Sequence, residues 1–124
     1  MLLRRDHPAR AYRRAAFDAR VRGASAADLV IVCLDETVES LVRALAMEGR
    51  GMPHRQAEWL AHAHAAVAAL EGGIADGAPL TIALRTFYAA ARRKILGAMT
   101  RFDADRVMQM KADFTDIAVA MRAV

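Results

Sequence analysis

Three histidines and a glutamate in the middle of the chain come closest to a metal-binding pattern. His54, His62 and His64 fall in one predicted helix, together with Glu58. His62 and His64 are two residues apart, about 200° around a helix, so one face cannot present both to a single ion. Carboxylate-bridged metal bundles use Glu-x-x-His, a spacing of three, on two helices, whereas Glu58 and His62 are four apart. We therefore expect no metal site, and solvated or capping histidines.

Patterns for nucleophilic catalysis and phosphate binding are also weak. Cys33 lies in an apolar run, where a thiol is typically buried and inert. The serines of the chain, Ser25 and Ser40, are not in a nucleophile elbow. The glycines between residues 72 and 77 follow a predicted helix and not a strand, so they do not indicate a phosphate-binding loop. The sequence predicts a protein that is not an enzyme and has no cofactor.

The positive charge of the chain is concentrated at its beginning. The formal net charge is +4, but residues 1–22 carry seven arginines and two aspartates, which leaves residues 23–124 at −1. Such an arm could contact nucleic-acid phosphates. Only Tyr12 and Phe17 accompany it as stacking residues, and no recognition motif is present. We expect no nucleic-acid partner.

Compartment and membrane signals point to the cytoplasm. A single cysteine cannot form a disulfide within the chain, which fits a reducing compartment. The longest strongly apolar run, Leu29 to Leu34, is far shorter than the ~20 residues that span a bilayer. Arg4 and Arg5 follow the first three residues directly, where a signal peptide would continue with apolar ones. We expect a cytoplasmic protein without membrane insertion.

Helix-start signals divide the chain into a short basic arm, residues 1–23, and four longer helices. Ser25 suits an N-cap, Pro53 and Pro79 suit first helical turns, and Asp103 suits another cap. Glycines stand in the intervening breaks. The predicted ranges are 9–21 within the arm, then 25–47, 53–71, 79–100 and 103–124.

Apolar residues recur at alternating steps of three and four in each of the longer segments, the pattern of helices that pack lengthwise. Four such stripes with short connections predict an all-α fold, an antiparallel up-down four-helix bundle. The short N-terminal helix or arm is additional, and residues 1–124 form one domain. The stripes are Ile31, Leu34, Val38, Leu41 and Leu45; Leu60, Ala63, Val67 and Leu70; Leu80, Leu84, Phe87, Ala91 and Ala98; and Val107, Met110, Phe114, Ile117, Met121 and Val124.

Several apolar residues lie beside these stripes, among them Val32, Tyr88, Leu96 and Met99. One interpretation is a core that buries a wide arc of each helix. The other is an apolar groove open to a partner helix.

Four short motifs stand in two parts of the chain. The pair Ala11-Tyr12 precedes the segment ASAADLVIVCLD at 24–35, and the segment LRTFY at 84–88 precedes RRKI at 92–95. The first two motifs resemble the beginning of the FliS family of flagellin export chaperones, and the last two resemble its later Leu-x-x-Leu-Tyr helix and basic pair. The alignable part covers nearly the whole chain. Three residues differ from the family pattern: Ala26, Leu34 and Glu36 replace its proline, tyrosine and glycine.

The resemblance implies a chaperone that binds the disordered C-terminal region of flagellin, prevents its premature polymerisation and assists type III flagellar secretion. Such a segment must offset its ordering cost by burying apolar area on the chaperone. A component of the export gate is a further expected partner. Tyr12 and the arm would cover part of the groove in the free protein and move aside on binding. The expected partner-binding residues are Tyr12, Leu29, Val30, Val32, Cys33, Leu84, Tyr88, Leu96 and Met99.

Two alternatives remain open at this point. A generic helical interaction module would use its apolar surface to close a homodimer. A small nucleic-acid-binding protein would use the basic arm, and its affinity would fall steeply with salt.

Overall fold

Four consecutive amphipathic segments form four helices. The computed structural model describes residues 26–74, 76–77 and 80–123. The helices are α2 (Ala26–Gly49), α3 (Pro53–Gly72), α4 (Thr81–Thr100) and α5 (Ala104–Arg122), and the described part of the chain contains no strand. The predicted all-α four-helix bundle is confirmed. The predicted arm helix at 9–21 and the cap at Ser25 lie outside the described residues, as does Pro79.

The helix ends follow from local chemistry. Pro53 occupies the first turn of α3, where its missing N–H would have no helical partner. Gly51, in the preceding turn, has a φ of 63°, a conformation that favours glycine. Asp103 caps α5, because its side chain accepts a hydrogen bond from the Arg106 backbone N–H at 3.2 Å. The predicted starts of α3 and α5 are therefore confirmed.

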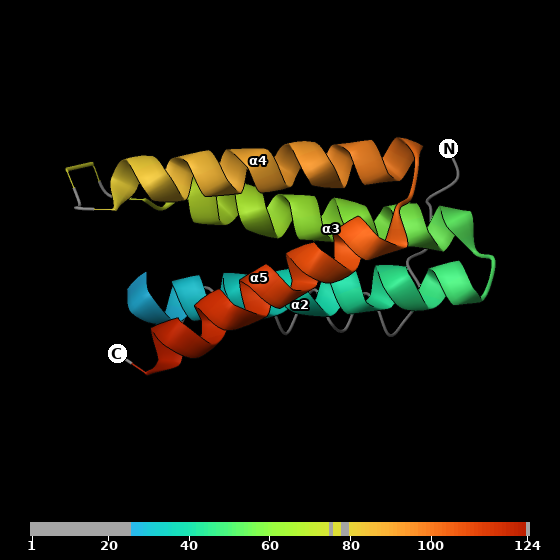
Figure 1. Cartoon of the computed structure of the whole chain (residues 1–124). Coiled ribbons are helices and arrows are strands. Elements are labelled where there is room, and N and C mark those ends of the chain that lie inside the picture. Colours follow the sequence, from blue (N-terminus) through green and yellow to red (C-terminus); the bar gives the residue numbers. More distant parts are fainter. Residues whose placement is uncertain (1–25, 75, 78–79, 124) are drawn as a thin grey trace, which may run out of the picture.

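The helices are not packed equally on one another (Figure 1). α2 packs against both α3 and α5, and α3 packs against α4, whereas α4 and α5 contact each other only sparsely. α5 begins beside the end of α4 and runs back obliquely toward the beginning of α2. An ion pair between Arg122 on α5 and Asp35 on α2 joins these two helices. Arg92 on α4 pairs with Glu71 on α3 at 2.6 Å. α4 and α5 thus diverge from their short connection.

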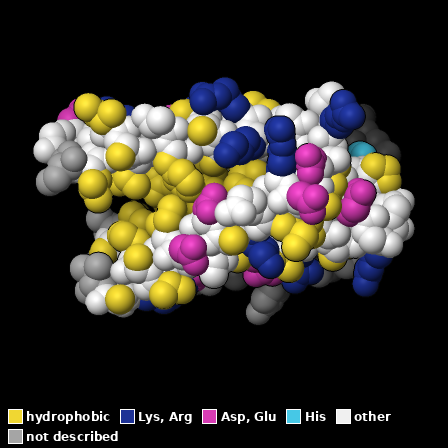
Figure 2. Space-filling view, in the orientation of Figure 1, with side chains coloured by type: hydrophobic (Ala, Val, Ile, Leu, Met, Phe, Trp, Pro, Cys, Tyr) yellow, Lys and Arg dark blue, Asp and Glu magenta, His cyan; other side chains and the backbone are white. Residues whose placement is uncertain are grey.

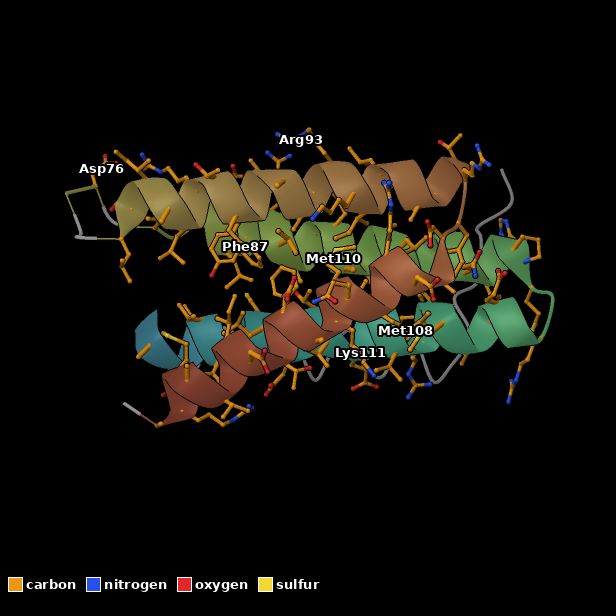
Figure 3. The ribbon with its side chains drawn as sticks, in the orientation of Figure 1. Asp76, Phe87, Arg93, Met108, Met110 and Lys111 are labelled. Carbon is orange, nitrogen blue, oxygen red and sulfur yellow. The ribbon has the colours of Figure 1, made fainter. Side chains whose placement is uncertain are left out.

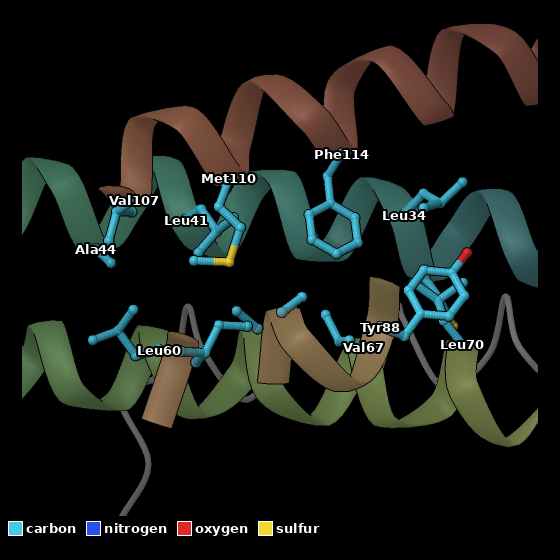
Figure 4. Packing of buried hydrophobic residues seen from close by; sticks show 14 of the residues in the cluster. Leu34, Leu41, Ala44, Leu60, Val67, Leu70, Tyr88, Val107, Met110 and Phe114 are labelled. Atoms are coloured by element: carbon cyan, nitrogen blue, oxygen red, sulfur yellow. The ribbon is translucent and has the colours of Figure 1, made fainter. Parts of the chain in front are cut away.

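The core lies where α5 faces α2 and α3. Figure 4 shows Phe114 and Met110 reaching into it from α5, with Leu60 and Val67 facing them from α3. Phe114, Leu60 and Val67 are completely buried. Small residues such as Ala44 and Ala63, both fully buried, allow α2 and α3 to approach closely. The remaining buried apolar residues are Cys33, Leu34, Leu41, Ala66, Leu70, Tyr88, Ala91, Ile95, Ala98, Val107 and Ala118.

The buried face of α2 is rotated from the predicted stripe. Leu34 and Leu41 are buried as predicted, but Val38 is only half-buried. Thr37 and Ser40 are fully buried instead. The Thr37 hydroxyl donates to the Cys33 carbonyl oxygen at 2.8 Å, so its burial leaves no unmet hydrogen bond. A pattern of apolar residues alone does not predict the burial of small polar residues whose side chains form hydrogen bonds within their own helix.

The predicted stripe of α3 is confirmed, and those of α4 and α5 need correction at their open ends. Tyr88, expected beside the α4 stripe, is buried, as is Ile95, whereas Leu80 is 65% exposed. On α5, Val107, Met110 and Phe114 are buried, but Met121 is exposed. The exposure of Leu80 and Met121 has one cause: α4 and α5 separate, so residues far from the connection between them lose a packing partner. No helix in the described residues is long and apolar enough to cross a membrane.

Truncation of the residue at the centre of the core tests this packing. Phe114→Ala should lower the free energy of unfolding by about 3–5 kcal/mol, because it removes a fully buried ring and leaves a cavity. Urea denaturation followed by circular dichroism measures the change. Val119→Ala on the same helix is the control; that side chain is 63% exposed, and its loss should cost less than about 0.5 kcal/mol. Equal effects of the two substitutions would contradict the described packing of α5.

Candidate functional site

A concave apolar feature lies in the space between α4 and α5. Figure 2 shows a hollow between these helices, lined by hydrophobic side chains, at the end away from their connection. Leu84 and Phe87 of α4 and Ile117 of α5 are half-buried and pack against the core. Leu84 lies three residues before Phe87, and Ile117 three after Phe114, so each pair shares a helix face. We name this feature the α4–α5 groove and define its walls by Leu84, Phe87 and Ile117.

Three aromatic rings lie together at the base of the groove, Phe87 from its wall and Tyr88 and Phe114 from its floor. The Phe87 and Phe114 ring centroids are 5.2 Å apart, and the Tyr88 ring is stacked on Phe114 at 6.3 Å and 14°. Figure 3 places Phe87 in the space between α4 and α5, with Met110 farther along the same space. Tyr88 and Phe114 are buried, whereas Phe87 remains partly exposed. The aromatic cluster therefore ends in an accessible ring that a ligand could cover.

Burial determines the chemistry of the two ionisable groups near this floor. Burial raises the pKa of the Tyr88 hydroxyl, and the nearby Cys33 raises it further. Burial also raises the pKa of the Cys33 thiol, as does the negative charge of Glu36. Both groups are therefore neutral at physiological pH, and Cys33 lacks the thiolate needed for nucleophilic attack. The site is suited to apolar contact.

The residues predicted to bind a partner lie on different parts of the bundle. The structure brings Cys33 and Tyr88 together in the core, and Leu84 lies on the groove wall. Leu29, Val30 and Val32 are half-buried near the beginning of α2, while Leu96 and Met99 are 49% and 39% exposed near the end of α4. Tyr12 lies outside the described residues.

Leu96 lies on a different side of α4 from the groove. It is nine residues after Phe87, which corresponds to about half a turn around the helix axis. Leu96 is therefore separated from the groove, although it lies on the same helix as the groove residue Phe87.

The sequence interpretation did not name Phe87, Phe114 and Ile117 as site residues. It placed all three on core stripes, and stripe positions are normally covered by a neighbouring helix. Phe87 and Ile117 stay partly exposed only because α5 turns away from α4. The aromatic residue three positions after Leu84 was the available signal, but periodicity alone could not distinguish a covered stripe from an open one.

The histidines are dispersed along α3. His54 is exposed, His62 contacts the Trp59 ring at 5.3 Å between centroids, and His64 is half-buried. The His64 Nε2 atom is buried and has no hydrogen-bond partner among the described residues. Nowhere in residues 26–74, 76–77 and 80–123 do three His, Cys, Asp or Glu side chains gather as metal ligands would.

Comparison with known proteins adds no family assignment. No protein-family model matches the chain, and no curated protein matches it either.

The neutrality of the Cys33 thiol can be tested by its reactivity. At pH 8 the thiol should react with iodoacetamide at least about tenfold more slowly in the folded protein than in urea. Mass spectrometry of alkylated protein gives the rates in the folded protein and in urea, and equal rates would contradict the burial of this side chain.

The pKa of this thiol also makes the stability of the fold depend on pH. Because folding raises the thiol pKa, the contribution of this group to the free energy of unfolding is complete only below its unfolded pKa. That contribution is lost progressively as the pH rises above the unfolded pKa.

Proposed function

We propose that this protein is a binding module that captures an unfolded segment of another protein in the α4–α5 groove. The observation that carries the proposal is the partly exposed apolar wall formed by Leu84, Phe87 and Ile117, next to a completed core. A helix laid into this groove would cover both walls and add a fifth helix to the bundle. Helix-in-groove recognition uses apolar anchors at steps of three and four, which matches the spacing of such a wall.

The partner we propose is the disordered C-terminal segment of flagellin, bound in the cytoplasm before export. The resemblance to flagellin export chaperones includes the segment Leu84–Tyr88, and this segment supplies both Leu84 and Phe87 to the groove wall. An unfolded segment that folds on binding recovers part of its ordering cost by burying apolar surface. Occupying the groove would also keep the bound segment from polymerising prematurely, as the resemblance implies.

The favoured chemistry is binding without catalysis. The base of the groove consists of the Phe87, Tyr88 and Phe114 rings, and burial keeps the Cys33 thiol and the Tyr88 hydroxyl neutral. Rings present a large apolar area and lose little rotamer entropy when a partner covers them. This arrangement supports recognition of an apolar helix face, with no cofactor.

Self-association is the second candidate function, and a separate surface favours it. Met108 and Val119, which are 52% and 63% exposed, lie eleven residues apart on α5, about three full turns. They therefore share one side of α5, on the far side from the buried Phe114. A second copy of the chain could cover this side. Because this side of α5 is separate from the groove, a flagellin segment bound in the groove should leave such self-association intact, which a mass measurement with and without the segment would reveal.

A substitution on each wall of the groove tests the binding proposal. Phe87→Asp should weaken binding of a flagellin C-terminal segment at least about tenfold, because a carboxylate would be desolvated against the apolar wall. Ile117→Ser on the opposite wall should weaken it in the same direction. Titration calorimetry measures each affinity, and thermal melts confirm that each variant is folded.

Leu96→Asp is the matched comparison, since it places the same charge on the same helix about half a turn away. We expect it to bind like the parent protein. Loss of binding in Leu96→Asp, with normal binding in Phe87→Asp and Ile117→Ser, would place the partner on the outer side of α4 and overturn the groove assignment.

A further inference from the structure

A second cavity lies at the closed end of the groove, where α4 turns into α5. It has a volume of about 610 Å³, and four cationic side chains line it: Arg93 and Lys94 of α4, Arg101 in the connection and Arg106 of α5. Apart from Asp103, its remaining lining residues are small or apolar and include Gly97 and Met110. We name it the basic pocket. Met110 lies in the same space between α4 and α5 as Phe87, so the basic pocket continues the line of the groove (Figure 3).

The positive charge of the basic pocket is largely uncompensated by the described residues. Asp103 is the one carboxylate among its lining residues, and it lies 3.6 Å from Arg106, with both side chains more than half exposed. Arg93, Lys94 and Arg101 form no ion pair with any residue that the structure describes. Lys and Arg side chains also gather along α4 in Figure 2, on the side of the groove. Residues 23–124 together carry a net charge of −1, so the excess of positive charge is local to the basic pocket.

We infer that the basic pocket binds carboxylates at one end of an amphipathic helical segment whose apolar face lies in the groove. This inference rests on the proposed binding function of the groove, although not on the partner's being flagellin. Arginine and lysine side chains donate strong hydrogen bonds to carboxylates. An apolar wall followed by a cationic pocket therefore fits a segment that is apolar along most of its length and acidic at one end. The pocket would also fix the direction in which that segment lies.

The shape and composition of the basic pocket favour a protein segment over nucleic acid. No Phe, Tyr, Trp or His is among its described lining residues, so it offers no ring on which a base could stack. Asp103 stands at its edge, and Asp105 follows in the first turn of α5, where two carboxylates would repel a phosphate backbone. A carboxylate on a helix brings one charge and little bulk.

Synthetic helical peptides test this inference without flagellin. Two peptides have leucines at steps of three and four, and each also carries three glutamates. The glutamates lie at the amino end of the first peptide and at the carboxyl end of the second. Each acidic peptide has a control peptide, its sister, with glutamines in place of the glutamates. One acidic peptide should bind about tenfold more tightly than its sister at low salt, and the advantage should shrink at 0.5 M salt, where the screening length is only a few ångströms. Titration calorimetry gives the four affinities.

Matched double variants locate the effect. Arg93→Ser with Arg101→Ser should abolish the preference for glutamate while leaving binding of the glutamine peptides unchanged. Arg50→Ser with Arg55→Ser removes the same charge from exposed positions around the turn between α2 and α3, and should keep the preference. Equal binding of acidic and neutral peptides would overturn the basic pocket alone. Absence of binding by all four would overturn it together with the groove, and DNA binding that requires Arg93 and Arg101 would assign the pocket to nucleic acid.

Discussion

The course of α5 is the constraint on which the rest of the structure depends. Phe114 packs its ring completely into the core, and Arg122 pairs with Asp35, so α5 is held against α2 along its length. Because α5 starts at the end of α4, it must leave α4 in order to follow α2. If each helix packed equally on both of its neighbours, the apolar residues of α4 would be covered. In this bundle Leu84 and Phe87 of α4 remain partly exposed at the edge of the groove.

The close packing of α2 and α3 makes this course favourable. Ala44 of α2 and Ala63 of α3 are completely buried, and the Gln56 side chain of α3 donates to the Ala44 carbonyl oxygen at 3.2 Å. Small side chains lower the distance between helix axes, which leaves α2 able to bury a second helix on its other side. Large core residues then come from every helix, among them Leu41 of α2, Tyr88 of α4 and Phe114 of α5.

Charge and apolar surface are arranged along the same line. At the open end of the α4–α5 groove, Leu84, Phe87 and Ile117 present apolar walls. At the closed end, the connection after α4 brings Arg101 and Arg106 near Arg93 and Lys94. A surface that is apolar at one end and positive at the other discriminates between segments by sequence and by direction, since apolar burial supplies affinity and charge supplies orientation.

Local sequence signals were sufficient for the helices. Pro53, Asp103 and the glycine-containing breaks act through the backbone of their own neighbourhood, so the helix ends can be predicted within a few residues. The α3 stripe was also predictable, because both of its neighbours cover it. The all-α class and the four-helix count follow from these local features.

The candidate site was decided by the tertiary structure. Phe87, Phe114 and Ile117 have the same spacing as fully covered stripe residues, and Leu96 and Met99 have the same apolar character as groove residues. Their accessibility depends on which pairs of helices share an interface, a property of contacts between distant segments that periodicity does not encode. Thr37 and Ser40 are buried for a related reason: close approach between helices selects small side chains, whether apolar or polar. The sequence by itself determined where the helices begin and end. Only the tertiary structure decided that α5 follows α2 and leaves Leu84 and Phe87 of α4 partly exposed, because that choice depends on contacts between distant segments, such as those that bury Phe114.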